Sequence, residues 1–159
     1  MKKRIIKLLI CLSVLLNILV VTAVILATTG KLVPLLAPLI TTTMGPKYER
    51  LVSQYEGFTL QSGDVVFLGD SITQGGSWHE LFPNRPVRNR GIGGDTTKGV
   101  LNRLHQVTNG KPSQVFLLIG TNDVNFGETD ETIVENIDTI IEQIADESPK
   151  TQVFVQTIL

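Results

Sequence analysis

Cysteine and histidine are both scarce in this chain of 159 residues. The single cysteine, Cys11, excludes an intrachain disulfide. The two histidines, His79 and His105, leave few candidates for a general base. Acidic residues are missing from the beginning of the chain, where the first is Glu49, and no basic patch occurs beyond the N-terminus. With a formal net charge of −1, the composition argues against nucleic acid as a partner.

Charged residues are also absent from Leu8 to Gly30, a run of 23 positions. A helix of about 20 apolar residues is long enough to cross a bilayer. Lysine and arginine precede the run, and the positive-inside tendency places such an N-terminus in the cytoplasm. We therefore expect residues 1–30 to form a cytoplasmic tip and a single-pass anchor in the cell membrane. Residues 8–30 would contact the lipid bilayer, and the rest of the chain would be extracytoplasmic.

Two alternatives to an uncleaved anchor are weaker. A cleaved signal peptide has an apolar region of about 7–15 residues that ends in a small-residue cleavage site. Here the run is longer, and no Ala-x-Ala follows it. A lipoprotein signal would need a small residue before Cys11, but Ile10 stands there.

The segment after the anchor, residues 31–46, is apolar but contains Pro34 and Pro38. Because proline removes a backbone donor and disrupts a helix interior, we expect a juxtamembrane stalk or an interfacial segment here. The remaining residues, 47–159, are enough for one folded domain.

Apolar runs and helical spacings alternate along this domain. Continuous apolar runs predict buried strands at 64–69 and 113–120, with a weaker strand at 86–92 and a final one at 151–159. Helical spacing predicts helices at 47–57, 96–107 and 128–147, and a helical turn at 78–82. The inner face of the helix at 128–147 is predicted to comprise Ile133, Val134, Ile137, Ile140, Ile141 and Ile144. This alternation predicts an α/β fold with a parallel sheet covered on both faces.

Three polar, glycine-containing segments follow the first three strands. They read GDSIT at 69–73, GIGGDTT at 91–97 and GTND at 120–123. Since ligands bind such sheets at the carboxyl ends of the strands, the three segments are expected to meet at one edge. There Ser71 would be a nucleophile, with the backbone N–H groups of Ser71 and Gly94 and the amide of Asn122 directed at a developing oxyanion.

Each segment alone has an ordinary structural explanation. Gly-Asp-Ser is also typical of a turn in which Asp or Ser caps a helix. A dinucleotide site is disfavoured because Thr96 stands where the third glycine of the fingerprint belongs. A G-x-x-x-x-G-K-[ST] phosphate loop is absent.

Taken in order, GDSIT, GIGGDTT and GTND resemble the SGNH (GDSL-type) hydrolase superfamily. With WHELF and RNRGIGGDTTKGVLNRL, the closest likeness is to its platelet-activating-factor acetylhydrolase-like branch. The resemblance covers about residues 47–159. It implies a flavodoxin-like three-layer α/β/α fold, with Ser71 as nucleophile and Gly94 and Asn122 completing the oxyanion hole. It also implies an acyl-ester substrate, on a lipid or a carbohydrate, and neither a metal nor a cofactor.

One part of the family pattern is missing. The catalytic His and Asp of such enzymes lie in a late Asp-x-x-His motif, and no Asp-x-x-His occurs in this chain. His79 is a substitute only if it reaches Ser71, and a surface position on a short helix is the favoured expectation for it. His105 is expected at the far end of its helix from the site.

The sequence thus predicts a membrane-anchored, extracytoplasmic serine esterase whose domain lacks its last strand and helix. A fragment of a longer esterase, a truncated and inactive product, and a non-catalytic membrane-tethered binding or scaffold module are the three explanations to weigh. The first two are favoured, and residues 1–159 alone are expected to be poorly active because serine without a base is a weak nucleophile.

Overall fold

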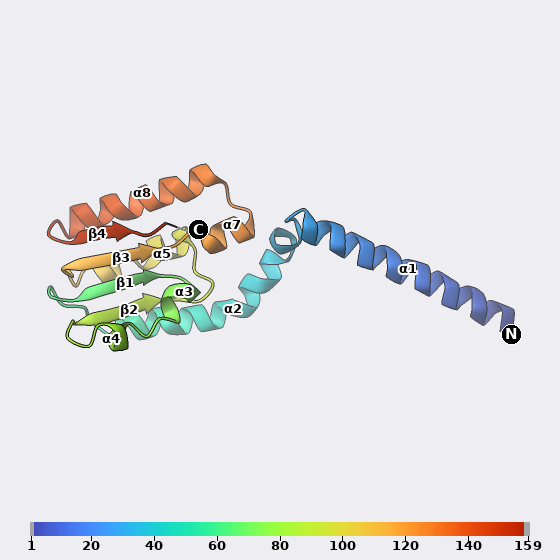
Figure 1. Cartoon of the computed structure of the whole chain (residues 1–159), viewed down its shortest axis with the longest axis horizontal. Helices are drawn as coiled ribbons and strands as arrows, with labels where there is room; N and C mark the ends of the chain where they lie inside the picture. Colours follow the sequence, from blue (N-terminus) through green and yellow to red (C-terminus); the bar gives the residue numbers. More distant parts are fainter. Residues whose placement is uncertain (1, 158–159) are drawn as a thin grey trace. The chain divides into compact units, whose positions relative to one another are not determined.

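The computed structural model describes the backbone of residues 2–157 and the side chains of residues 5–33, 35–36 and 45–157 (Figure 1). The chain divides into two compact units, Met1–Pro38 and Leu39–Leu159.

The first unit contains helix α1, Lys2–Thr28. Within the described residues, Ile5–Thr28 is the one helix long and apolar enough to cross a membrane. Nearly all of its side chains are exposed. A signal sequence near the N-terminus satisfies the same criterion, so the helix establishes a candidate span and leaves its sidedness open.

Helix α2, Leu32–Glu56, runs through the segment that was expected to be a juxtamembrane stalk or an interfacial segment, and its helical form was not predicted. The segment 31–46 is almost wholly helical, and the helix includes Pro34, Pro38 and Pro46. Pro34 lies in the first turn, where a backbone N–H has no intrahelical acceptor, so proline is tolerated there. The helix at 47–57 is therefore the second half of a longer one.

The second unit is built on a four-stranded sheet in the order β2-β1-β3-β4. The strands are β1 (Val65–Gly69), β2 (Val87–Gly91), β3 (Gln114–Leu118) and β4 (Gln152–Val155). All three pairings are parallel, and Gly69 lies beside Gly91 on one side and Leu118 on the other. The parallel sheet predicted from the alternating pattern is confirmed.

One face of the sheet holds the main apolar core. Helices α5 (Thr97–Arg103), α6 (His105–Thr108) and α8 (Asp130–Glu147) and the second half of α2 cover this face. The core comprises Leu60, Val66, Leu68, Val100, Leu104, Val107, Val115, Leu117, Ile119, Ile140 and Ile144. The predicted inner face of α8 is right except at Val134, which is 55% exposed because it lies at the edge of the apolar stripe.

The opposite face carries aromatic side chains from three neighbouring strands. Phe67 stacks on Phe116 at 5.1 Å between ring centroids, and Phe116 stacks on Phe154 at 4.8 Å. Trp78 covers Phe67 at 4.0 Å. The short helices α3 (Ser71–Gln74) and α4 (Trp78–Leu81) lie on this side and complete the three-layer α/β/α arrangement (Figure 1).

Helix α7, Thr121–Phe126, was not predicted from the sequence. Its residues include Asn122, Asp123 and Asn125, which have low helix propensity. Buried Asp123 fixes its beginning, since the carboxylate accepts the Thr97 hydroxyl at 2.6 Å and the Thr97 N–H at 3.0 Å. A tertiary contact, which no local pattern reveals, thus defines the helix.

Truncation of Ile140 is expected to destabilise the second unit strongly. Ile140 is fully buried against β1 and β3, so Ile140→Ala should lower the free energy of unfolding by about 2–5 kcal/mol. Val134→Ala, on the same helix but exposed, should change it by less than about 0.5 kcal/mol. Urea denaturation of the two variants checks this, and equal losses would contradict the assigned inner face of α8.

Candidate functional site

Ser71 lies where β1 ends and α3 begins. The preceding residue, Asp70, caps the helix, because its Oδ1 accepts the Ile72 N–H at 2.9 Å. The Ser71 side chain is exposed, directly after a fully buried strand. This is the placement expected of a reactive hydroxyl at the end of a strand.

Gly69 allows the ends of β1 and β3 to approach closely. A Cβ at this position would collide with the Leu118 carbonyl oxygen and the Thr73 hydroxyl. Backbone from β3 therefore occupies the volume that a side chain would need. The close contact brings the segment after β3 toward Ser71.

The loop after β2, residues 93–95, lies next to Ser71. The Gly93 N–H donates to Gln74 Oε1 at 2.9 Å, and a Cβ on Gly93 would contact the Ser71 Cβ at 3.7 Å. Gly94 has a φ of +81°, in the left-handed region that favours glycine. Within the described part of the chain, no acceptor is bonded to the Gly94 N–H.

Asn122 lies in the first turn of α7 and contacts the same loop. Its Nδ2 donates to the Asp95 carbonyl oxygen at 2.8 Å. An amide nitrogen carries two hydrogens, so one remains for another acceptor. The structure thus brings Ser71, Gly94 and Asn122, predicted from three separate segments, to one edge of the sheet.

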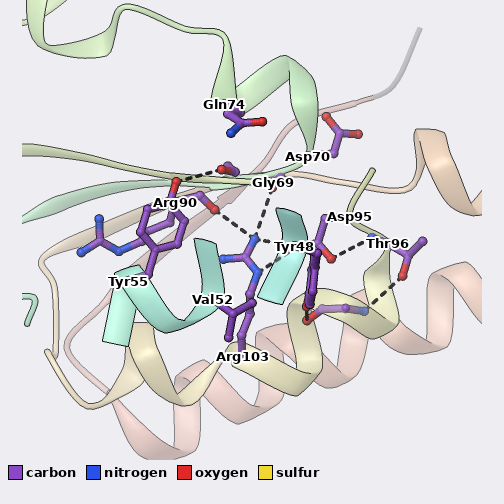
Figure 2. A network of polar contacts seen from close by, with 12 residues as sticks. Tyr48, Val52, Tyr55, Gly69, Asp70, Gln74, Arg90, Asp95, Thr96 and Arg103 are labelled. Carbon is purple, nitrogen blue, oxygen red and sulfur yellow. Dashed lines mark hydrogen bonds and ion pairs between the residues drawn. The ribbon is translucent and has the colours of Figure 1, made fainter. Parts of the chain in front are cut away.

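A buried polar network lies behind the glycine loop (Figure 2). Its centre is an ion pair between Arg103 Nη2 and Asp95 Oδ2 at 2.7 Å, and both side chains are 1% exposed. Tyr55 from α2 donates to the Gly91 carbonyl at 3.0 Å, and the Arg90 guanidinium stacks over the Tyr55 ring at 4.8 Å. Sequence inspection missed this network, because arginine on a helix is ordinarily a surface residue.

Two buried carboxyl groups in this region have perturbed acidity. Burial raises the pKa of Asp70, and the Ile72 N–H opposes the rise. Asp70 Oδ2 is buried without a hydrogen-bond partner among the described residues. Burial also raises the pKa of Asp95, against the opposing charge of Arg103. Both groups lie next to predicted site residues, and perturbed acidity is common at functional sites.

Tyr48 from α2 reaches the start of α5, where its hydroxyl donates to the Gly99 carbonyl at 3.1 Å. Burial, followed by the negative charge of Asp95, raises the pKa of Tyr48 to about 12 from an ordinary value of 10.0. A cavity of about 300 Å³ opens beside Tyr48 and Gly94, with Lys98 and Phe126 also in its wall. Helix α2 thereby contributes Tyr48 to the surroundings of the loop at residues 93–95.

The raised pKa of Tyr48 predicts a loss of stability at alkaline pH. The folded state holds the phenol proton more tightly than the unfolded chain, so this contribution is complete below about pH 10 and is lost as the pH rises through about 12. Denaturation at a series of alkaline pH values should show the wild type losing stability more steeply than Tyr48→Phe. Parallel curves for the two proteins would refute the shift.

Both histidines lie on the surface beside glutamates. His79, on α4, has its Nε2 3.9 Å from Glu80 Oε1, and its side chain is 79% exposed. His105 Nε2 is 3.7 Å from Glu56 Oε1, in a hollow that it shares with Leu60, which precedes β1. Within the described residues, neither histidine is hydrogen-bonded to Ser71, and no cluster of three or more His, Cys, Asp or Glu could hold a metal ion.

The geometry defines an α/β hydrolase-like domain with a strand-end serine and a neighbouring glycine loop. The sequence pattern of the GDSL-like Lipase/Acylhydrolase family matches residues 67–159. The chain belongs to this family.

Curated relatives agree with the family. The chain is 36% identical over 121 residues to platelet-activating factor acetylhydrolase IB subunit alpha2 of Rattus norvegicus, covering 70% of this chain and 52% of that protein. It is 35% identical over 120 residues to subunit alpha1 of Bos taurus, covering 69% and 51%. The chain thus spans about half the length of the curated relatives it matches.

Solved structures agree with the fold. A structure described as a platelet activating factor from Streptococcus pneumonia has a TM-score of 0.71 and 28% identity, covering 77% of this chain and 60% of that one. A structure described as an acylhydrolase from Bacteroides fragilis has a TM-score of 0.59 and 29% identity, covering 70% of this chain and 57% of that one. The SGNH-hydrolase family esterase AlinE4, at 22% identity and a TM-score of 0.51, supports the fold alone and covers 58% of each chain.

Proposed function

We propose that this protein is an ester hydrolase in which Ser71 is the nucleophile. The Ser71 and Gly94 N–H groups and the Asn122 side-chain amide are the proposed oxyanion donors. The substrate class is an acyl ester with a small acyl group on a lipid or a carbohydrate. The names of the curated relatives, which contain acetylhydrolase, support a short acyl group.

The observation that carries this proposal is the convergence of three segments around Ser71. A Cβ on Gly93 would lie 3.7 Å from the Ser71 Cβ, and Asn122 is bonded to Asp95, two residues beyond Gly93. The N–H groups of Ser71 and Gly94 donate to no acceptor in the described structure, so they are available to a developing negative charge. Such donors contribute most where they are fixed before the reaction begins.

In the proposed reaction, Ser71 Oγ attacks the ester carbonyl carbon while a base removes its proton. The carbonyl oxygen becomes an oxyanion and is stabilised by the three donors. The intermediate collapses to an acyl-serine as the alcohol leaves with a proton, and water then attacks the acyl group to release the acid and restore Ser71. The family resemblance assigns the base to an Asp-x-x-His histidine, which this sequence lacks.

The test is hydrolysis of p-nitrophenyl acetate by the chain extended through an Asp-x-x-His segment. The extended protein should be active, and Ser71→Ala should abolish the activity. Ser77→Ala is the matched control, because Ser77 is an exposed serine six residues further along the chain and its side chain makes no capping bond. An extended protein that is folded but inactive would refute the proposed function.

A second candidate is a non-catalytic binding or scaffold module tethered to a membrane. The position of both histidines on the surface, beside glutamates, favours it for residues 1–159. Binding of an ester analogue without turnover, unchanged in Ser71→Ala, would support this alternative over the hydrolase.

Residues 8–30 are proposed to anchor the chain in the cell membrane, with the N-terminus cytoplasmic and the hydrolase domain, residues 47–159, outside. The apolar helix Ile5–Thr28 and the basic residues that precede the apolar run support this topology. Protease treatment of intact cells should remove the region after about residue 45 and leave the anchor. Protection of the domain in intact cells, with digestion after lysis, would overturn the topology.

A further inference from the structure

Arg103, the last residue of α5, joins three separate segments through one guanidinium group. Its Nε donates to Asp95 Oδ2 at 2.8 Å, and Nη2 lies 2.7 Å from the same oxygen. Nη2 also donates to the Arg90 carbonyl at 2.9 Å and to the Gly69 carbonyl at 3.3 Å. Figure 2 shows the guanidinium between the ends of β1 and β2 and the glycine loop.

Asp95 uses its remaining polar groups to fix the loop around it. Its Oδ1 accepts the Thr96 N–H at 2.9 Å, and its own N–H donates to the Ile92 carbonyl at 3.1 Å. Its carbonyl oxygen accepts Asn122 Nδ2 at 2.8 Å. The Arg103–Asp95 pair is therefore connected to all three segments of the candidate site.

We propose that Arg103 and Asp95 are positioning residues that set the separation of Ser71, Gly94 and Asn122. Ser71 follows the bonded carbonyl of Gly69 by two residues, Gly94 precedes Asp95 directly, and Asn122 is held by the Asp95 carbonyl. The pair touches no substrate and acts through these three groups. The catalytic consequence of this inference rests on the proposed function. That the Arg103–Asp95 pair fixes the positions of the three groups is a separate, structural claim.

Stability alone does not account for a charged pair at this place. Well-packed apolar residues often replace a buried ion pair without loss of stability. The planar fork of arginine offers several donors in fixed directions, which a lysine ammonium does not reproduce. Arg103 Nη1 is buried without a partner among the described residues. The position of the guanidinium therefore leaves one of its own nitrogens without a hydrogen bond. Its position instead matches the three acceptors that it joins.

The first measurement is nuclear magnetic resonance of the ¹⁵N-labelled chain of 159 residues in detergent micelles. Arg103→Met combined with Asp95→Leu replaces the pair by apolar side chains. We expect this variant to unfold cooperatively while the Asn122 side-chain amide and the Gly94 N–H change their resonances and exchange faster with water. Arg103→Lys should keep the charge and still fail to restore these resonances. Arg50→Met, on the exposed face of α2, is the matched control and should leave them unchanged.

The second measurement is Ser71-dependent hydrolysis of p-nitrophenyl acetate by the same variants, with imidazole added as a base. A displacement of the donors by about 1 Å should lower kcat by about 10²-fold, with little change in KM. Rescue of both the rate and the resonances by Arg103→Lys would show that only charge is needed and would overturn the proposal.

The two measurements separate the two claims. If the wild type shows no Ser71-dependent hydrolysis, the proposed function fails. The resonances of Asn122 and Gly94 still decide whether the Arg103–Asp95 pair fixes the positions of these two groups. A folded double variant with unchanged resonances overturns the inference. Should the double variant fail to fold, Asp95→Asn removes the negative charge of the pair with a smaller change of side chain. Unchanged resonances in that variant would likewise overturn it.

Discussion

The chain of 159 residues is expected to hydrolyse p-nitrophenyl acetate hardly faster than its Ser71→Ala variant until a base is supplied. A general base contributes about 10²–10⁴-fold to such reactions, and neither histidine is bonded to Ser71 among the described residues. Added imidazole should create a Ser71-dependent rate that rises with its concentration and with the fraction of imidazole that has lost its proton. The measurement is the difference in rate between wild type and Ser71→Ala at each concentration, which removes the reaction of imidazole itself with the ester.

Two further variants complete this experiment. His105→Ala should leave the imidazole-dependent rate unchanged, because His105 pairs with Glu56 in a hollow beside the segment that precedes β1. Strong hydrolysis without imidazole that is lost in both Ser71→Ala and His79→Ala would prove the expectation wrong. It would make His79 the base, and α4 would have to move its exposed histidine toward Ser71.

Asn122→Ala is expected to lower kcat by about 10²–10³-fold in the base-supplied chain, as removal of one oxyanion donor does elsewhere. KM should change little, because the amide is proposed to act on the charge that develops during the reaction. The substitution also removes the bond from Asn122 Nδ2 to the Asp95 carbonyl, so part of the loss reflects a freer glycine loop.

The matched control for Asn122 is Asn125→Ala, an exposed asparagine on the same short helix. It should leave kcat within about twofold of wild type, since surface substitutions away from special contacts have small effects. Equal losses in the two variants would assign the effect to the stability of α7. A normal kcat in Asn122→Ala would remove this amide from the proposed donors.

The sequence predicted the main strands and helices of the domain because the patterns that specify them are local. The apolar runs of β1 and β3 and the helical spacing of α8 each specify one element, and strand ends of a parallel sheet meet at one edge wherever they occur. Ser71, Gly94 and Asn122 could therefore be grouped before their contacts were known. The helical form of the proline-containing half of α2 was not predicted, although proline in a first turn, as at Pro34, is compatible with a helix.

The contacts that fix the loops could not be predicted from patterns of this kind. Gln74 holds the Gly93 N–H, and Arg103 joins Asp95 to two strand ends. Each bond links residues at least eight positions apart, and neither side chain belongs to an apolar repeat. The only signal was indirect: an arginine at a helical position next to Leu104, a fully buried residue. Helix α7 was missed for the same reason, since buried Asp123 defines it through a contact with Thr97.

The tight approach at Gly69 has a consequence for the engineering of this protein. A saturation library at this position should return only glycine among folded members, because the Leu118 carbonyl fills the space of a Cβ. Ile72, three residues later and 56% exposed, should accept most side chains. A search for variants with altered ester preference is therefore best made with Gly69 held constant and diversity placed at Ile72, directly beside Ser71.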